Sequence, residues 1–128
     1  MPVIVDAFPA QIECDTLVFR AIRTRWIKEG GITSEAFILR RFADGNCETG
    51  LSVGNNIQNG IGTLTKIRMV ASLHVGRIRT LNLDTIPDHE GAIHAEIKEL
   101  PPPEVILLAE RLATDLLIQT RIAWQENQ

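Results

Sequence analysis

The chain has 128 residues, of which 45% are hydrophobic and 23% charged, and its formal net charge is −3 at pH 7. This length suffices for one domain with its own core, and the composition is ordinary for a soluble globular protein. No stretch approaches the roughly 20 apolar residues that span a bilayer. The first 15 residues carry acids where a secretory signal has basic residues. We therefore expect one cytoplasmic domain over residues 1–128, without membrane association.

Positive and negative charges separate along the chain. Residues 1–80 contain ten Lys or Arg and seven Asp or Glu, a balance of +3, whereas residues 81–128 contain three and nine, a balance of −6. Two explanations remain open. The two halves could face and neutralise each other, which we favour, or the basic half could line a groove for a phosphate-bearing ligand.

The first half predicts short strands and turns. Residues 1–14 form a lead-in segment. Residues 16–22 are rich in β-branched and aromatic side chains and predict a buried strand, although Asp15 could instead cap a helix there. We favour the strand, followed by a helical turn over residues 26–29 and a break at Gly30 and Gly31.

The next segments alternate between helix and strand signals. Thr33-Ser34-Glu35 is typical of a helix start, while residues 36–42 fit a helix or a strand equally. Residues 49–53 predict a short strand. Residues 54–62 predict a loop rich in Gly and Asn, and Thr63 could cap a helix that runs to about His74, with Gly76 ending it.

A hairpin is predicted from two extended segments, residues 77–86 and 92–99, joined by a turn at residues 87–91. In the second segment Ile93, Ala95 and Ile97 alternate with polar residues, as in a strand with one buried face.

Residues 103–123 predict a long helix that begins near Pro103. Its apolar residues cover more than one face, which favours a homodimer contact through this helix. We expect the helix to lie across the hairpin. The fold class is therefore α+β: a small mixed or antiparallel sheet, the long C-terminal helix and one or two further helices.

Several motifs carry a resemblance to a family of small bacterial proteins of unknown function. They are Arg20, Ala36-Phe37, Leu51-Ser52-Val53, Arg77-Ile78-Arg79 and His94-Ala95, within residues 16–122. The resemblance implies a recurrent pattern and no particular activity.

A second likeness concerns residue order. Arg20 on an early strand, Ser52 on a second strand, and His94 with Glu96 on a later one resemble the order in ADP-ribosyltransferases. That resemblance implies that the Arg and Ser bind NAD and that the Glu stabilises a cationic sugar in the transition state. A carboxylate beside a developing positive charge is effective in a dry site. The chain departs from the family in lacking any Tyr and any Ser-Thr-Ser run.

Other chemistries find less support. His94 and Glu96 share a strand face and could bind a metal or transfer protons, but a third ligand is not apparent and no metal site is predicted. The glycine-rich run lacks the spacing of a phosphate loop or a dinucleotide fingerprint, and Ser52 lacks the nucleophile elbow. Cys14 and Cys47 have no metal or redox spacing, so we predict free thiols. We predict that Trp26 and Trp124 are packing anchors. The small number of aromatic residues argues against nucleic-acid binding.

Two functions follow from these observations. We favour a non-catalytic binding or accessory module that acts through protein contacts. The alternative is a small enzyme that uses NAD or another nucleotide through Arg20, Ser52, His94 and Glu96. An enzyme should gather these four side chains around one pocket, whereas a module should scatter them and present an apolar surface elsewhere.

Overall fold

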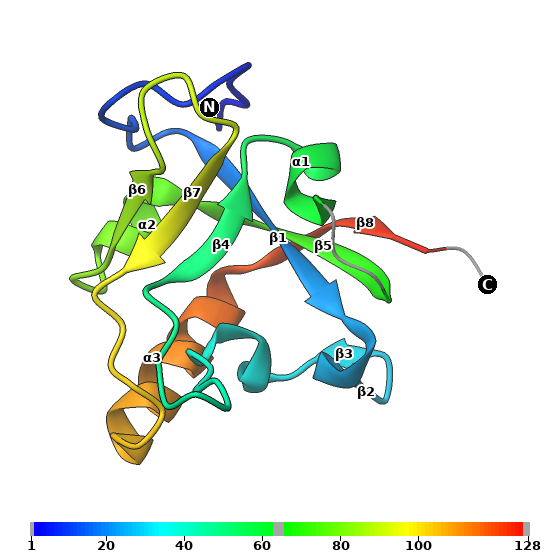
Figure 1. Ribbon diagram of the computed structural model, residues 1–128. Helices are drawn as coiled ribbons and strands as arrows, with labels where there is room; N and C mark the ends of the chain where they lie inside the picture. Colours follow the sequence, from blue (N-terminus) through cyan, green and yellow to red (C-terminus); the bar gives the residue numbers. More distant parts are fainter. Residues whose placement is uncertain (1, 63–65, 127–128) are drawn as a thin grey trace.

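The computed structural model describes residues 2–62 and 66–126 and is built around a six-stranded antiparallel sheet (Figure 1). The strand order is β6-β7-β4-β1-β5-β8, and β2 and β3 form a separate two-stranded sheet. The α+β prediction is confirmed, with the sheet antiparallel throughout. The strands are β1 (Leu17–Arg23), β2 (Ile27–Lys28), β3 (Gly31–Ile32), β4 (Leu51–Gly54), β5 (Ile67–His74), β6 (Asp84–Pro87), β7 (His94–Lys98) and β8 (Arg121–Gln125).

The helices are short except for the last. In the part of the chain that the structure describes, three are α-helical and two are 3-10 turns. They are η1 (Thr24–Trp26), η2 (Ser34–Phe37), α1 (Ile57–Ile61), α2 (Val75–Arg79) and α3 (Ile106–Gln119). None of the helices in residues 2–62 and 66–126 is long and apolar enough to cross a membrane.

The strand predicted at residues 16–22 is β1, which lies near the middle of the sheet. Both of its faces are covered, so its burial is almost continuous. On one face α1 packs so closely that Gly60 touches Phe19, and on the other η2 accepts a hydrogen bond from Arg20. Alternate residues of a strand point to opposite faces, so β1 separates α1 from η2.

The predicted hairpin is confirmed in its second strand and corrected in its first. Residues 94–98 form β7, and their partner β6 has only four residues. Residues 75–79, expected to lead into an extended segment, form α2 instead, and Gly76 lies inside this helix. Val75 and Ile78 of α2 are fully buried in the core. A helix places both apolar side chains in the core, and this burial favours the helix over the extended conformation that we predicted.

The helix predicted over residues 63–74 is wrong. Residues 63–65 lie outside the described residues, and residues 67–74 form β5, which pairs along its length with β1. Five consecutive residues of β5 are buried, from Met69 to Leu73. A strand covered on both faces has no period-two pattern, and a short apolar run of that kind resembles a helix in sequence.

The C-terminal prediction is right in kind and wrong in extent. The helix α3 ends at Gln119, and the following residues form the edge strand β8 beside β5, which contains Trp124. The helix buries Ala109, Leu112, Ala113 and Leu116. Its principal neighbours are η2 and β5. The expectation that it lies across the β6–β7 hairpin is therefore wrong, because η2 and β5 carry the apolar surface that the helix covers.

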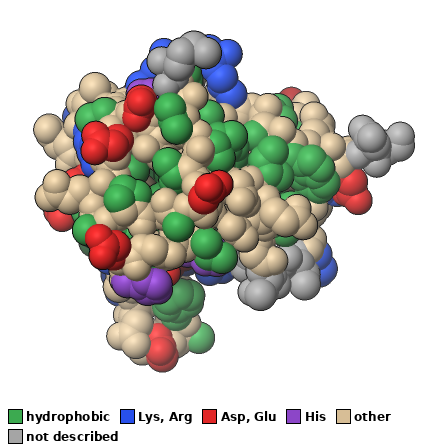
Figure 2. Space-filling view, turned by 90° about the horizontal axis from the view of Figure 1, so that it is seen from above, with side chains coloured by type: hydrophobic (Ala, Val, Ile, Leu, Met, Phe, Trp, Pro, Cys, Tyr) green, Lys and Arg blue, Asp and Glu red, His purple; other side chains and the backbone are tan. Residues whose placement is uncertain are grey.

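Hydrophobic side chains also lie at the surface. Figure 2 shows one face of the molecule, on which hydrophobic patches alternate with single acidic side chains. The largest exposed fractions belong to α3, where Leu107 is 87% exposed, Ile118 77% and Ile106 66%. Scattered exposed apolar residues are normal, but this concentration on one helix is not.

Candidate functional site

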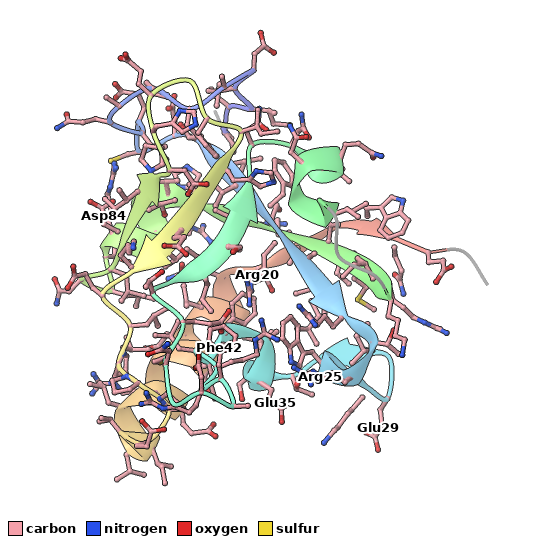
Figure 3. All side chains as sticks on the ribbon, viewed as in Figure 1. Arg20, Arg25, Glu29, Glu35, Phe42 and Asp84 are labelled. Carbon is pink, nitrogen blue, oxygen red and sulfur yellow. The ribbon has the colours of Figure 1, made fainter. Side chains whose placement is uncertain are left out.

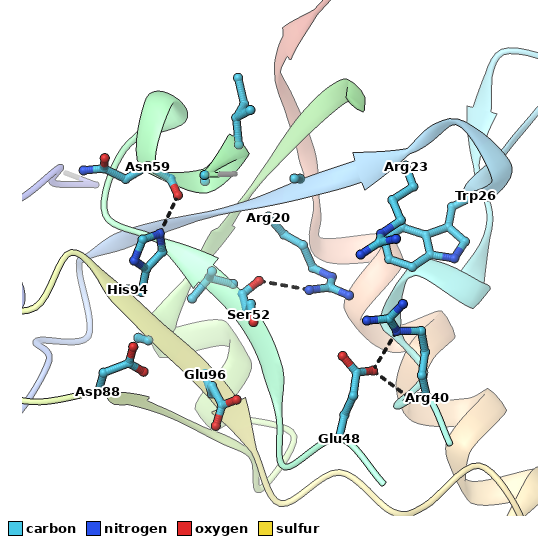
Figure 4. Close-up of a pocket in the computed structure, with 16 residues that line it drawn as sticks. Arg20, Arg23, Trp26, Arg40, Glu48, Ser52, Asn59, Asp88, His94 and Glu96 are labelled. Atoms are coloured by element: carbon cyan, nitrogen blue, oxygen red, sulfur yellow. Dashed lines mark hydrogen bonds and ion pairs between the residues drawn. The ribbon is translucent and has the colours of Figure 1, made fainter. Parts of the chain in front are cut away.

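A pocket of about 340 Å³ opens where β1, β4, β7 and α1 meet (Figure 4). Its walls come from segments far apart in the sequence, and polar and charged side chains dominate them. The charged and polar lining residues are Arg20, Arg23, Arg40, Glu48, Ser52, Asn59, Asp88, His94 and Glu96.

The pocket exists because β1 and β4 diverge. The register pairs them at Phe19 and Gly54, after which the strands separate. Arg20 fills the gap: its Nη1 donates to the Ser52 carbonyl at 2.9 Å and its Nε donates to the Ala36 carbonyl at 2.8 Å. The side chain that braces the gap therefore also forms part of the pocket.

Arg20 is buried without a carboxylate partner. It is 6% exposed, its guanidinium carbon lies 5.3 Å from the centre of the Trp26 ring, and no ion pair within 4 Å involves it among the described residues. Burial lowers the pKa of Arg20 to about 10, and this effect outweighs the opposing attraction of Glu48. Such a desolvated cation favours a negative charge beside it. Figure 3 shows Arg20 inside the fold and Glu29 at its periphery.

Two further arginines make this wall basic. Burial, together with the neighbouring Arg40, lowers the pKa of Arg23, whose buried Nε has no hydrogen-bond partner in the described part of the chain. Arg40 pairs with Glu48 at 3.4 Å. The Trp26 ring is 5% exposed and lies beneath Arg20, Arg23 and Arg25. Its indole is therefore covered by guanidinium groups and is not free to stack on a base.

The opposite wall is acidic and belongs to the second half of the chain. Ser52 of β4 pairs with Glu96 of β7, so the two side chains are neighbours on one face. The Glu96 carboxylate accepts a hydrogen bond from Thr49 at 3.0 Å and lies 2.8 Å from the Lys98 ammonium group. Asp88 joins this wall. Glu96 is thus fixed in place beside the pocket.

The third wall is the α1 turn, which several asparagines fix. The Asn56 side chain caps the turn at Asn59, and Asn55, which is fully buried, accepts from Asn59 and donates to the carbonyls of Val5 and Asp6. A Cβ added at Gly54 would lie 2.4 Å from the Asn59 and Gly60 backbone. Only glycine permits this contact. The loop predicted over residues 54–62 is wrong in part, because residues 57–61 form the helix α1.

The structure brings all four predicted site residues to this one pocket. Arg20 is buried, His94 and Glu96 are half-buried, and Ser52 is exposed. Sequence reasoning missed Arg23, Arg40, Glu48, Asp88 and Asn59. The separation of charge along the chain was the available signal, because the basic wall comes from residues 20–40 and the acidic carboxylates Asp88 and Glu96 from residues 88–96.

The other candidates lie elsewhere. His74 begins α2 as its N-cap, and His89 contacts the Glu90 carbonyl in the β6–β7 turn. No group of three or more metal-binding side chains occurs within residues 2–62 and 66–126. Both cysteines are free. Trp124 is 36% exposed on the edge strand, so it is a weaker packing anchor than Trp26.

A second hollow, of about 510 Å³, lies between residues 10–14 and β6. Its one arginine, Arg79, already donates to Asp84, to the Ile12 carbonyl and to the Cys14 sulfur. This guanidinium is satisfied, unlike that of Arg23, so the first pocket is the better candidate site.

The chain matches no protein-family model, no curated protein and no solved structure.

Proposed function

We propose that the pocket binds a phosphate-bearing nucleotide and that the protein is a small enzyme acting on NAD or a related nucleotide. The observation that carries this proposal is the convergence of Arg20, Ser52, His94 and Glu96 on one pocket whose buried arginine has no carboxylate partner in the described residues. A volume of about 340 Å³ falls within the range of small-molecule sites.

The polarity of the walls sets the orientation of the ligand. Arg20, Arg23 and Arg40 would receive phosphate oxygens, because guanidinium groups donate paired hydrogen bonds to them. Glu96 and Asp88, on the opposite wall, favour hydroxyl donors or a cationic group. NAD has both features, a pyrophosphate and a positively charged nicotinamide joined to ribose.

The chemistry would take place at the carbon that joins ribose to nicotinamide. When the C–N bond breaks, its electron pair passes to the ring and the sugar becomes cationic. The Glu96 carboxylate, fixed by Thr49 and Lys98, would stabilise that charge. A nucleophile then forms a new bond to the same carbon and loses a proton.

Thermal denaturation with NAD, ADP-ribose, ATP and pyrophosphate tests this proposal. A ligand present at a hundredfold its Kd stabilises the folded state by about 2.7 kcal/mol, which raises Tm by several degrees. Arg40→Gln should reduce the shift because it removes a guanidinium group from the pocket. Arg25→Gln is the matched control, since Arg25 also contacts Trp26 but does not line the pocket. No shift with any of the four compounds would contradict the proposal.

We infer a second candidate function, an accessory module that forms a homodimer through α3. Residues 105–108 are four consecutive exposed apolar residues, and runs of that length are rare at a surface without a partner. Glu110 and Arg111 follow them on the exposed side of the helix. In a twofold packing of two α3 helices, Glu110 of one copy could meet Arg111 of the other.

Light scattering at several concentrations tests the dimer. A molar mass of twice 14.2 kDa would support it. A mass of 14.2 kDa at 100 μM would exclude a stable dimer.

A further inference from the structure

One histidine of the pocket has its ring orientation set by the main chain. His94 begins β7, and its Nε2 lies 2.9 Å from the Asn59 carbonyl oxygen (Figure 4). A carbonyl oxygen can only accept a hydrogen bond, so Nε2 carries the hydrogen. In the neutral ring, Nδ1 is then the unprotonated nitrogen.

The accepting carbonyl cannot move away easily. Asn59 lies in α1, where the Asn56 side chain accepts from its backbone N–H at 2.8 Å and the Asn55 side chain accepts from its amide at 2.7 Å. Because Gly54 and Gly60 lack side chains, this turn packs closely against β4 and β1. The fold therefore fixes both the position and the tautomer of the imidazole, as a carboxylate or carbonyl partner does for catalytic histidines elsewhere.

The Nδ1 atom has no hydrogen-bond partner within residues 2–62 and 66–126. The ring lies on the same face of β7 as Glu96, and Asp88 lines the pocket beside them. Neither β4 nor α1, which pack against the ring, contributes a titratable group. The remaining charged lining residues are Arg20, Arg23, Arg40 and Glu48.

We propose that His94 is the general base of the reaction assigned above, and this inference rests on that proposed function. In hydrolysis, the oxygen of a water molecule bonds to the ribose carbon as the C–N bond to nicotinamide breaks, and Nδ1 of His94 accepts the proton that the water loses. The products are ADP-ribose, neutral nicotinamide and one proton, so the step needs no further reactant. Glu96, two residues along the strand, stabilises the sugar cation. His94 thus accepts the proton and Glu96 stabilises the charge.

His94→Gln separates this role from a structural one. The glutamine amide can still donate to the Asn59 carbonyl, but it has no basic nitrogen. We expect the variant to keep the wild-type Tm and the wild-type thermal shift with NAD, and to lose at least 100-fold in the rate of NAD hydrolysis. His89→Gln is the control, because His89 lies in the exposed turn outside the pocket.

The outcomes distinguish the two proposals. If His94→Gln keeps the wild-type rate, the inference is overturned and the NAD site stands. If the wild-type protein binds NAD without hydrolysing it, water is not the nucleophile and the inference also fails. If the wild-type protein neither binds nor hydrolyses NAD, the proposed function fails and takes the inference with it.

A measurement without catalysis tests the tautomer directly. The ¹⁵N chemical shifts of the neutral His94 ring should show a protonated Nε2 and an unprotonated Nδ1. The opposite tautomer would overturn the inference whatever the rates are.

Discussion

The pocket and the exposed surface of α3 belong to one small sheet protein but are built on opposite physical principles. The pocket is polar, and hydrogen bonds fix its walls: Arg20 braces β1 and β4, and Asn55 fixes the α1 turn. The α3 surface is apolar, and its outer residues contact little, with Leu107 87% exposed. Fixed polar groups are suited to a small ligand of defined geometry, whereas an exposed apolar surface is suited to another protein surface. The pocket therefore supports the hypothesis of a nucleotide-using enzyme, and the α3 surface supports that of a dimeric accessory module.

The largest effect is expected from a substitution that disrupts the pocket and leaves α3 intact. Gly54→Ala places a methyl group where only 2.4 Å separates the Cβ position from the α1 backbone, so the turn must move. We expect a loss of about 2–3 kcal/mol of stability and of the NAD-dependent thermal shift. Gly31→Ala is the control, because its Cβ would have no neighbour closer than 3.8 Å. Unchanged ligand binding in Gly54→Ala would show that the α1 wall is dispensable.

Arg20→Met removes the buried charge from the pocket. A hydrogen bond to a charged group is worth about 1.5–3 kcal/mol, so the Kd for ADP-ribose should rise roughly 10- to 100-fold in calorimetric titration. The substitution also leaves the carbonyls of Ala36 and Ser52 without a donor. Arg20→Lys keeps the charge and should retain part of the affinity. Equal affinity in Arg20→Met and the wild type would place the phosphate elsewhere.

Two further substitutions, Leu107→Glu and Ile118→Glu, change the exposed apolar surface of α3 and leave the pocket intact. Both side chains are more than three-quarters exposed, so monomer stability should change by less than about 0.5 kcal/mol. If α3 forms a dimer contact, light scattering should show a monomer for each variant and the NAD shift should remain. Ile86→Glu is the control, an exposed apolar residue on β6. A wild-type dimer that survives both substitutions would exclude α3 as its interface.

The smallest effect is a pH dependence. Because burial lowers the pKa of Arg20 to about 10, the free pocket loses this charge as the pH rises through that value. The affinity for ADP-ribose should be constant from pH 7 to 9 and fall by up to about tenfold per pH unit above 10. Above pH 10 the unfolded chain still binds the proton that folded Arg20 has lost, so this group does not itself unfold the protein as the pH rises. The same decline in Arg20→Met would assign it to another group.

Much of the local structure could be predicted from sequence because it depends on local patterns. The alternation of Ala95 and Ile97 with polar residues predicted β7, and the β-branched run before Arg23 predicted β1. In both strands the signal lies within the strand's own residues and does not depend on a distant partner. The same holds for the centre of α3, where Leu112 and Leu116 recur at helical spacing.

Elements defined by distant partners could not be predicted in this way. β5 is central in the sheet, between β1 and β8, and packs against α1 and α3, so its residues show no alternation. β8 has five residues, four of them exposed, and its only regular partner among the described strands is β5. The site shows the same limit: residue order suggested Arg20, Ser52, His94 and Glu96, whereas Arg23, Arg40 and Asp88 reach the pocket only because the strands fold next to one another.

The order of strands also determines how this protein must fold. β1 pairs with β5 some 50 residues later, as in the contact between Phe19 and Ser72, and β5 in turn waits for β8, as in that between Ala71 and Ile122. Chain closure over such distances precedes any gain from the sheet, so refolding should take milliseconds to seconds instead of microseconds. During synthesis on the ribosome, the apolar strand β5 stays without its outer neighbour until β8 emerges. That interval is the period in which the nascent chain is most exposed to aggregation and most in need of chaperones.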